Sequence, residues 1–479
     1  MAQLPRQAKT RQTKIVCTLG PATTSPERIR QLILAGMDVA RLNFSHGDAA
    51  THRNTIRSIR TLSRELGREI GILQDLAGPK IRLGMLPVPE RELRTGDRVA
   101  FSPGESRDPA VIPVDYPYLL EDVAVGNRIL LADGLVELEA EAIAGDRLVC
   151  RVIAGGVISS RKGMNLPLSH LRIPSFTDKD REDLRVGLEE GVDFVGVSFV
   201  RHEKDLEPIH EMIRGHGGAR PLVIAKIEKP EAVERLAWIL NQVDGLMVAR
   251  GDLGVEVPLE EVPIIQKRII RAARRAGKPV ITATQMLRSM VSSPRPTRAE
   301  AADVANAVLD GTDAVMLSEE SAVGDYPIEA VAMLDRIARV AEPHRREADL
   351  LEEPDSRFLR ETEACVSRAA ARLAYDLKAA AIVAFTQSGK TARFVARFRP
   401  DRPVIALTPS LETQRQLSLS SGVIPTRVES FSGTDQIFAL VSSWAVEKGV
   451  ARKGDRLVVT AGVPLGTPSS TNLLRVLEV

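Results

Sequence analysis

The stretch LVIAKIEKPEAVERLAWILNQVDGLMVARGDLGVEVP, Leu222 to Pro258, decides the fold of this chain. It holds two apolar runs of strand length, Leu222–Ala225 and Gly245–Val248, and each ends abruptly in charged residues. The segment between them begins at Pro230, a residue suited to a first helical position, and continues with helical spacing of apolar residues. The stretch therefore predicts two parallel strands joined by a helix, with the carboxyl ends of both strands at one edge of a sheet.

Charged side chains follow both of these strands. Lys226 and Glu228 end the first strand, and Arg250 and Asp252 end the second. Lys226 and Glu228 stand two residues apart and could simply neutralise each other as a structural ion pair. Asp252, next to Gly251, adds a second carboxylate, and Mg²⁺ is typically held by one or two carboxylates together with substrate phosphate and water. Because ligands of parallel α/β proteins bind at this edge, we expect a divalent-metal site beside a cation.

The same alternation of strand and helix runs through most of the chain. Three predicted strands precede residue 83 and five follow residue 175, which together make the number that closes a parallel barrel. The predicted strands are Ile15–Thr18, Val39–Leu42, Ile70–Leu73, Phe194–Val197, Leu222–Ala225, Gly245–Val248, Val280–Ala283 and Ala314–Leu317.

The chain thus divides into three predicted domains. Residues 1–82 and 176–345 form a (β/α)₈, or TIM, barrel of the α/β class. Residues 83–175 interrupt the barrel after its third strand, and the strictly alternating run Leu135–Ala142 predicts a small all-β domain that could close as a lid. Residues 355–479 alternate strands and helices again, with too few units for another barrel, and predict an open α/β domain.

Composition limits the partners and the location of the protein. Lys and Arg number 65 against 63 Asp and Glu, so no overall field attracts nucleic acid or a membrane surface, and aromatic residues, at 4%, are too few for a single-strand groove. No apolar run approaches the ~20 residues of a membrane span, and the basic amino terminus lacks the apolar core of a signal peptide. Cys17, Cys150 and Cys365 are expected to be buried free thiols. We expect a soluble cytoplasmic protein.

Polar side chains follow nearly every predicted barrel strand and would surround one mouth of the barrel. Cations outnumber carboxylates among them, which fits a phosphorylated anion with bound Mg²⁺ better than a neutral substrate. His46 is either a general base or a hydrogen-bonded structural residue, and no G-x-S-x-G, H-E-x-x-H or C-x-x-C motif is present. In chain order the candidate residues are Arg41, Asn43, Ser45, His46, Asp75, Lys80, Arg82, Ser198, Lys226, Glu228, Gly251, Asp252, Thr284 and Ser318.

A second candidate site lies in the third domain, where Ala384–Phe394 reads AFTQSGKTARF. A nucleotide P-loop needs Gly five residues before Gly389, and Ala384 stands there. A regulatory phosphate pocket at a helix amino terminus is the preferred interpretation, and a simple capped turn is the alternative. The effector-phosphate candidates are Thr386, Ser388, Gly389, Lys390 and Thr391.

Seven segments, in this order and spacing, resemble the pyruvate kinase family over essentially the whole chain: DVARLNFSHG, LQDLAGPKIR, RKGMNLP, AKIEKPEAV, MVARGDLGVEVP, TATQML and MLSEESAVGDYP. The resemblance implies phosphoryl transfer from phosphoenolpyruvate to ADP, giving pyruvate and ATP in the last step of glycolysis. It implies Mg²⁺ or Mn²⁺ as cofactor and an allosteric homotetramer. A Mg²⁺-dependent oxoacid lyase or aldolase on a TIM barrel, and a catalytically silent metabolite sensor, remain as alternatives.

The resemblance also implies a role for each candidate residue. Glu228 and Asp252 would ligate the metal, Lys226 would stabilise the transferring phosphoryl group, and Thr284 would stand near the enol carbon. Arg41 and Ser318 would complete the catalytic set, and Ser198 and Gly251 would contact the substrate. The nucleotide residues would be Arg82, Asn43, His46 and, from the inserted domain, Lys162.

One departure from the family pattern concerns the monovalent cation. Many members read DTKGPEIR where this chain reads DLAGPKIR at Asp75–Arg82. In those members K⁺ lies near that Glu, together with residues that match Asn43, Ser45 and Asp75. Lys80 places an ammonium group where the Glu and its ion would be, so the sequence predicts activity without K⁺.

Overall fold

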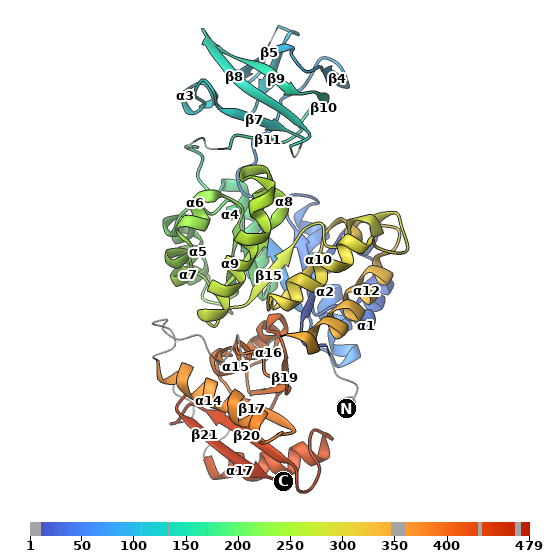
Figure 1. Ribbon diagram of the computed structural model, residues 1–479, viewed down its shortest axis with the longest axis vertical. Helices are drawn as coiled ribbons and strands as arrows, with labels where there is room; N and C mark the ends of the chain where they lie inside the picture. Colours follow the sequence, from blue (N-terminus) through green and yellow to red (C-terminus); the bar gives the residue numbers. More distant parts are fainter. Residues whose placement is uncertain are drawn as a thin grey trace.

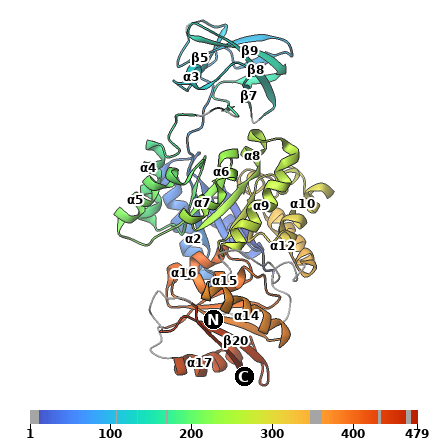
Figure 2. The ribbon, with the colours of Figure 1, turned by 60° about the vertical axis from the view of Figure 1, so that its left-hand side comes forward.

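Three units follow one another along the length of the molecule (Figure 1). The computed structural model describes residues 11–106, 108–132, 134–167, 169, 171–345, 361–429, 434–464 and 471–479; the proposed domain starts at residues 1 and 355 lie outside these ranges. A barrel occupies the middle, the inserted strands lie beyond one end of it, and the last part of the chain packs against the other end (Figures 1 and 2). No helix in the described ranges is both long and apolar enough for a membrane span.

The central unit is a closed barrel of eight parallel strands, which confirms the predicted fold class. Its strands run around the barrel in chain order. Their bounds are β1 Lys14–Leu19, β2 Val39–Asn43, β3 Gly71–Asp75, β12 Phe194–Val197, β13 Leu222–Ile227, β14 Gly245–Ala249, β15 Val280–Ala283 and β16 Ala314–Leu317. The helices around it are α1 Pro26–Ala35, α2 Ala49–Leu66, α4 Asp178–Glu190, α5 Glu207–His216, α6 Pro230–Glu234, α7 Leu236–Gln242, α8 Arg250–Glu256, α9 Val262–Arg275, α10 Arg298–Leu309, α11 Glu319–Ala322 and α12 Pro327–Ala341.

Local signals set most helix boundaries in the barrel. Helix α1 begins where Ser25 accepts a hydrogen bond from the backbone of Arg28, and α2 ends at Gly67 in the left-handed conformation. The helix expected after Pro230 is two helices instead, because Arg235 leaves helical geometry at φ −93° and ψ 14°. No Pro or Gly marks this break in the sequence.

The inserted unit is a β domain between β3 and β12. Its main sheet has the order β11-β7-β8-β9-β5-β6, and β10 pairs with β4. In β8 the apolar side chains alternate inward and the glutamates outward, where Glu137, Glu139 and Glu141 meet Arg128 and Arg151 of the neighbouring strands β7 and β9. The bounds are β4 Glu90–Leu93, β5 Arg98–Pro103, β6 Val111–Val114, α3 Leu119–Asp122, β7 Arg128–Leu131, β8 Val136–Ala144, β9 Arg147–Ala154, β10 Gly156–Ser159 and β11 Met164–Asn165.

The carboxyl-terminal unit is an open five-stranded sheet of order β19-β18-β17-β20-β21, parallel except for its last strand. The bounds are α14 Thr362–Asp376, β17 Ala381–Phe385, α15 Lys390–Ala396, β18 Val404–Thr408, α16 Leu411–Gln416, β19 Val423–Arg427, α17 Thr434–Glu447, β20 Arg456–Ala461 and β21 Leu473–Glu478.

Cys17 and Cys150 are buried, but the expectation for Cys365 is wrong: it is exposed. Helix α14 turns Ala364, Ser367 and Ala370 toward the core, which leaves Cys365 on the opposite side.

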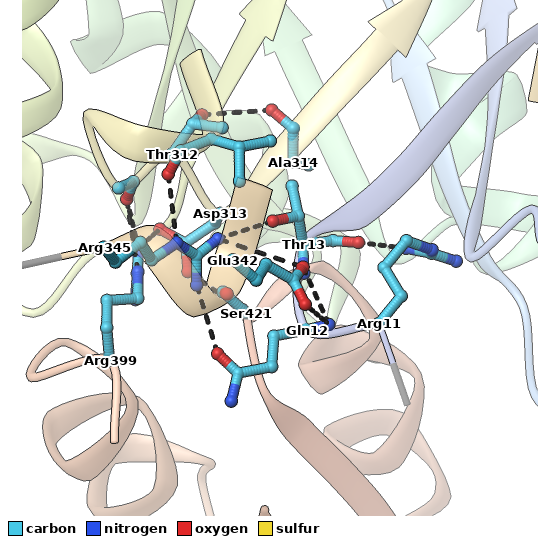
Figure 3. A network of polar contacts seen from close by, with 12 residues as sticks. Arg11, Gln12, Thr13, Thr312, Asp313, Ala314, Glu342, Arg345, Arg399 and Ser421 are labelled. Atoms are coloured by element: carbon cyan, nitrogen blue, oxygen red, sulfur yellow. Dashed lines mark hydrogen bonds and ion pairs between the residues drawn. The ribbon is translucent and has the colours of Figure 1, made fainter. Parts of the chain in front are cut away.

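A buried polar network joins this carboxyl-terminal unit to the barrel (Figure 3). Asp313, just before β16, accepts hydrogen bonds from the Arg399 guanidinium at 2.7 Å and from the Ser421 backbone at 2.9 Å. Glu342, which follows α12, accepts from the backbone of Gln12 and Thr13, and the Gln12 amide donates to the backbone oxygen of Pro400 at 3.0 Å. Because these groups come from distant parts of the chain and exclude water, they fix how the two units sit on each other.

Asp313→Asn is expected to destabilise the protein by about 3–5 kcal/mol, since it leaves the buried Arg399 guanidinium without its counter-charge. The urea concentration at the midpoint of unfolding measures the change. Asp401→Asn is the matched control, because Asp401 pairs with Arg402 at the surface and such pairs contribute about 0–1 kcal/mol. Equal midpoints for the two variants would contradict this account of the network.

Candidate active site

Lys226 is the centre of a buried charged cluster at the carboxyl ends of the barrel strands. It is the fifth residue of β13, and its side chain is 12% exposed. Its ammonium group lies 2.8 Å from the Glu228 carboxylate and 3.4 Å from that of Asp75, at the end of β3. It also donates to the Ser198 hydroxyl at 2.7 Å. Strands β3, β12 and β13 thus bring these groups together. The sequence predicted this, because it placed polar side chains at the carboxyl ends of these strands.

The carboxylates keep Lys226 charged. Burial by itself lowers the pKa of a lysine, but Asp75, Glu228 and Asp252 outweigh it and raise the pKa of Lys226 well above its ordinary value. Burial likewise raises the pKa of Asp75, and Lys226 and Arg41 together reverse that effect. The site therefore presents a fixed ammonium group with little access to water.

Arg41, in β2, extends the cluster on one side. Its Nε donates to Asp75 at 2.7 Å, and its Nη1 donates to the Thr18 hydroxyl at 2.8 Å. Sequence reasoning missed Thr18, although this residue lies near the end of β1 and the rule applied to the other strands could have found it. The two contacts hold the Arg41 guanidinium at the mouth of the barrel.

Glu228 has the properties of a metal ligand. It is 1% exposed, and burial, together with the nearby Asp252, raises its pKa above the ordinary value although Lys226 lies beside it. One oxygen accepts from the Phe199 backbone at 2.7 Å; the other lies beside Lys226 and accepts no hydrogen bond within the described ranges. An oxygen ligand of this kind fits Mg²⁺. No group of three His, Cys, Asp or Glu side chains in the described part of the chain forms a metal cage, so substrate oxygens would complete the coordination.

Gly251 and Thr284 meet at the next two strand ends. The Thr284 hydroxyl accepts from the Gly251 backbone at 2.7 Å, and Thr284 has φ +68°, which is strained for a β-branched residue. Arg250 stabilises this conformation, because its guanidinium donates to the backbone oxygens of Ala283 and Thr284. The sequence showed Arg250 after the strand but gave no sign that it supports Thr284.

Glu320 holds the backbone that follows β16, the last strand of the barrel. It is 1% exposed and accepts hydrogen bonds from the backbone of Ser318 at 2.7 Å and of Leu287 at 3.0 Å. The Ser318 hydroxyl is buried and has no hydrogen-bond partner in the described residues.

Other predicted residues do not join the cluster. Ser45, His46, Lys80 and Lys162 are exposed, and within the described ranges their side chains make no hydrogen bond or ion pair to it. Arg82 donates to the backbone oxygen of Arg161, beside Lys162. Asn43 pairs in register with Asp75 across β2 and β3.

A recess lies here between the inserted unit and the barrel. Lys80 and Asp252 line it together with Met164, Asn165 and Lys229. Direct contacts cross it. The Asn165 amide of the inserted unit donates to Glu256 of α8 at 3.2 Å, and Arg201 of the barrel donates to the backbone oxygens of Leu171 and Ile173. Glu256 also pairs with the buried Lys229 at 2.6 Å. Sequence reasoning missed this pair. It links the segment that carries Glu228 to the helix that carries Asp252.

The candidate effector residues lie in the carboxyl-terminal unit, at the start of α15. Gly389 has φ +81°, Lys390 pairs with Glu363 at 3.0 Å, and the Thr391 and Thr471 hydroxyls are 2.8 Å apart. Thr386 and Thr391 are buried, at 8% and 6% exposed. These residues form one loop before and at the start of α15 (Figure 1), whereas Lys226 lies in the barrel strand β13.

The fold and this cluster define an α/β-barrel protein with a buried charged site at the carboxyl ends of its strands. Comparison with known proteins gives the family. The chain matches the family models described as "Pyruvate kinase, barrel domain" over residues 10–331 and "Pyruvate kinase, alpha/beta domain" over residues 364–477. The chain belongs to the pyruvate kinase family, and it is a phosphotransferase.

Relatives support this assignment along nearly the whole chain. The chain is 48% identical to "Pyruvate kinase 2" of Synechocystis sp., over 97% of this chain and 79% of that protein. It is 46% identical to "Pyruvate kinase" of Geobacillus stearothermophilus, over 97% and 80%, and 43% identical to that of Clostridium perfringens, over 98% and 99%. The lyase and silent-sensor alternatives have no support from these matches.

Proposed function

We propose that this chain transfers the phosphoryl group of phosphoenolpyruvate to ADP, giving pyruvate and ATP. The observation that carries the proposal is the buried Lys226 ammonium, held by carboxylates at the barrel mouth. The oxygen–phosphorus bond of phosphoenolpyruvate breaks as an oxygen of the terminal phosphate of ADP bonds to phosphorus. The resulting enolate then takes up a proton. Such a reaction asks the protein mainly for alignment and charge neutralisation.

Each residue of the site has a place in this reaction. Lys226 lies beside the transferring phosphoryl group and stabilises its charge, and Arg41 with Arg82 binds phosphate oxygens. Glu228 and Asp252 hold Mg²⁺, which supplies charge neutralisation for the substrate when bound. Thr284 stands near the carbon that is protonated. The remaining assignments are Ser198 and Gly251 for substrate, Ser318 for catalysis, and Asn43, His46 and Lys162 for the nucleotide.

The inserted unit acts as a lid in this proposal. Lys162 is exposed on it and approaches the nucleotide only when the unit closes over the barrel mouth. We propose the domain boundaries 1–82 with 176–345, 83–175 and 355–479, and a cytoplasmic homotetramer.

A coupled assay tests the reaction directly. Purified protein with phosphoenolpyruvate, ADP and Mg²⁺ is expected to form pyruvate and ATP in equal amounts, and to lose activity with EDTA. An oxoacid lyase would instead release pyruvate from a substrate without forming ATP. Absence of ATP formation would overturn the proposed function.

We further propose that the reaction does not need K⁺. Lys80 lines the same recess as Asp252, and its ammonium group can supply the charge that the K⁺-dependent members take from the ion. In the present arrangement Lys80 is exposed, so the proposal requires its side chain to turn inward with bound substrates.

The loop Thr386–Thr391 is proposed to bind the phosphate group of an allosteric effector. Its buried threonines and the glycine at the start of α15 support this. Sugar phosphates and AMP are expected to shift the phosphoenolpyruvate KM of the wild-type protein several-fold. Thr391→Val removes one hydroxyl and is expected to abolish this shift, as steady-state rates with and without the effectors would show; an unchanged shift would contradict the assignment.

A further inference from the structure

Lys229 and Glu256 form a buried ion pair beside the two proposed metal ligands. Lys229 is 7% exposed and Glu256 is 6% exposed, and their charged groups are 2.6 Å apart. Lys229 directly follows Glu228 in the chain, and Glu256 is the last residue of α8, the helix that carries Asp252. The pair therefore ties the segment of one proposed ligand to the helix of the other.

Asp252 and Glu256 lie on one face of α8, because they are four residues apart, about one helical turn. The helix is short and lies at the end of the barrel that faces the inserted unit (Figures 1 and 2). Its first residue, Arg250, donates to backbone oxygens at the end of β15 and just after it. Its last residue is held on the side of β13 by Lys229. Asp252 thus lies between two anchored ends of one helix.

Lys229 also contacts the residue that holds Glu228. Its ammonium group lies over the Phe199 ring, 5.9 Å from the ring centroid, within the range of a cation–π interaction. The Phe199 backbone donates to Glu228 at 2.7 Å, and Phe199 has φ +55°, a conformation that needs support from its surroundings. Lys229 is therefore in contact with the surroundings of both proposed ligands.

The two proposed ligands repel each other. Asp252 raises the pKa of Glu228, which shows that the carboxylates are close enough for their charges to interact. Contacts outside the two carboxylates must oppose this repulsion. The Lys229–Glu256 pair can do so without adding net charge beside the metal. Stability alone does not account for the pair, because apolar residues of similar size are often as stabilising as a buried ion pair.

We propose that Lys229 and Glu256 are positioning residues, whose ion pair sets the separation of Glu228 and Asp252 for a divalent cation. The inference rests on the proposed role of those two carboxylates as metal ligands. Removing groups that hold metal ligands in place, without touching the metal, commonly lowers metal affinity by about 10–100-fold. The Asn165 amide of the inserted unit donates to the same oxygen of Glu256, so the pair also lies where the proposed lid meets the barrel.

Mn²⁺ binding to the full chain tests this role, with free Mn²⁺ measured by electron paramagnetic resonance. The double variant Lys229→Met/Glu256→Met leaves the net charge of the site unchanged, and apolar replacement of a whole buried pair is usually tolerated. It is expected to raise the Mn²⁺ Kd about tenfold or more. The matched control is Lys267→Met/Asp310→Met, which removes a lysine–aspartate pair between α9 and the end of α10. It should leave the Kd within about twofold.

The single variant Lys229→Met separates position from charge. Loss of a cation beside Glu228 would by itself tighten Mn²⁺ binding, so a raised Kd supports displaced ligands, and a lowered Kd would show that Lys229 acts only through its charge and overturn the proposal. Should the double variant fail to fold, this variant decides by the same criterion.

The Mg²⁺ dependence of the rate gives a second measure in the double variant. The Mg²⁺ concentration for half-maximal rate should rise by a factor similar to that of the Mn²⁺ Kd, whereas kcat at saturating Mg²⁺ should fall by less. A pair with a purely structural role would lower the urea midpoint of unfolding and leave both metal constants unchanged, which would overturn the proposal.

Glu228→Gln distinguishes failure of this inference from failure of the proposed metal site. It removes a proposed ligand and should weaken Mn²⁺ binding more than the double variant does. If Glu228→Gln loses Mn²⁺ but the double variant binds it as tightly as the wild-type protein, the positioning role is overturned and the metal site stands. If Glu228→Gln binds Mn²⁺ normally, the ligand assignment and the positioning role are both wrong, and the coupled assay of ATP formation still judges the reaction.

Discussion

Lys226→Met is expected to lower kcat for phosphoryl transfer by at least ~10²–10³-fold, or roughly 3–4 kcal/mol in transition-state stabilisation. The ammonium group is nearly dehydrated and is surrounded by Asp75, Glu228 and Asp252, so its interaction with a developing negative charge is little screened by water. An interaction that forms mainly in the transition state lowers kcat and kcat/KM together. Steady-state rates with phosphoenolpyruvate and ADP at saturating Mg²⁺ measure both quantities.

Two controls separate this effect from misfolding. Lys453→Met removes an exposed lysine of the carboxyl-terminal unit and should leave kcat unchanged. Lys226→Met also removes a counter-charge from buried carboxylates, so its unfolding midpoint is measured alongside. A variant that is folded at the assay temperature and retains near-normal kcat would refute the assignment of Lys226.

The barrel and the centre of its site were accessible from sequence for a simple geometric reason. Apolar runs of strand length fix the strands, and parallel strands place the residues after them at one mouth. The sequence therefore predicts that Asp75, Lys226 and Glu228 lie at the same mouth of the barrel. The same rule would have found Thr18, which was overlooked.

Other features had no comparable signal in the sequence. Arg399 and Asp313 belong to different units, and only the docking of the carboxyl-terminal unit on the barrel brings them together. The Asn165–Glu256 contact likewise depends on how the inserted unit sits over the barrel. Such placements are set by packing between units rather than by periodicity within one segment.

Lys80→Glu is expected to make the enzyme dependent on K⁺. We expect the wild-type protein to have nearly the same kcat/KM with and without KCl, because the Lys80 side chain, once it turns inward with bound substrates, supplies a positive charge near them. The glutamate reverses that charge in the recess that Asp252 also lines, and the extra repulsion should lower activity in K⁺-free buffer at least tenfold, or about 1.4 kcal/mol. Added KCl should restore most of the loss in Lys80→Glu by providing a cation at the site.

Ionic strength must be kept constant in this comparison, since salt also screens exposed charges. Tetramethylammonium chloride serves as the K⁺-free salt, because its cation is too large for a K⁺ site. Lys204→Glu, at an exposed position in the 3₁₀ helix Glu203–Leu206 between β12 and α5, is the control for a general change of charge, and it should respond equally to both salts. Strong activation of the wild-type protein by KCl would show that Lys80 does not replace the ion. Equal rates of Lys80→Glu in both salts would show that residue 80 does not determine the requirement.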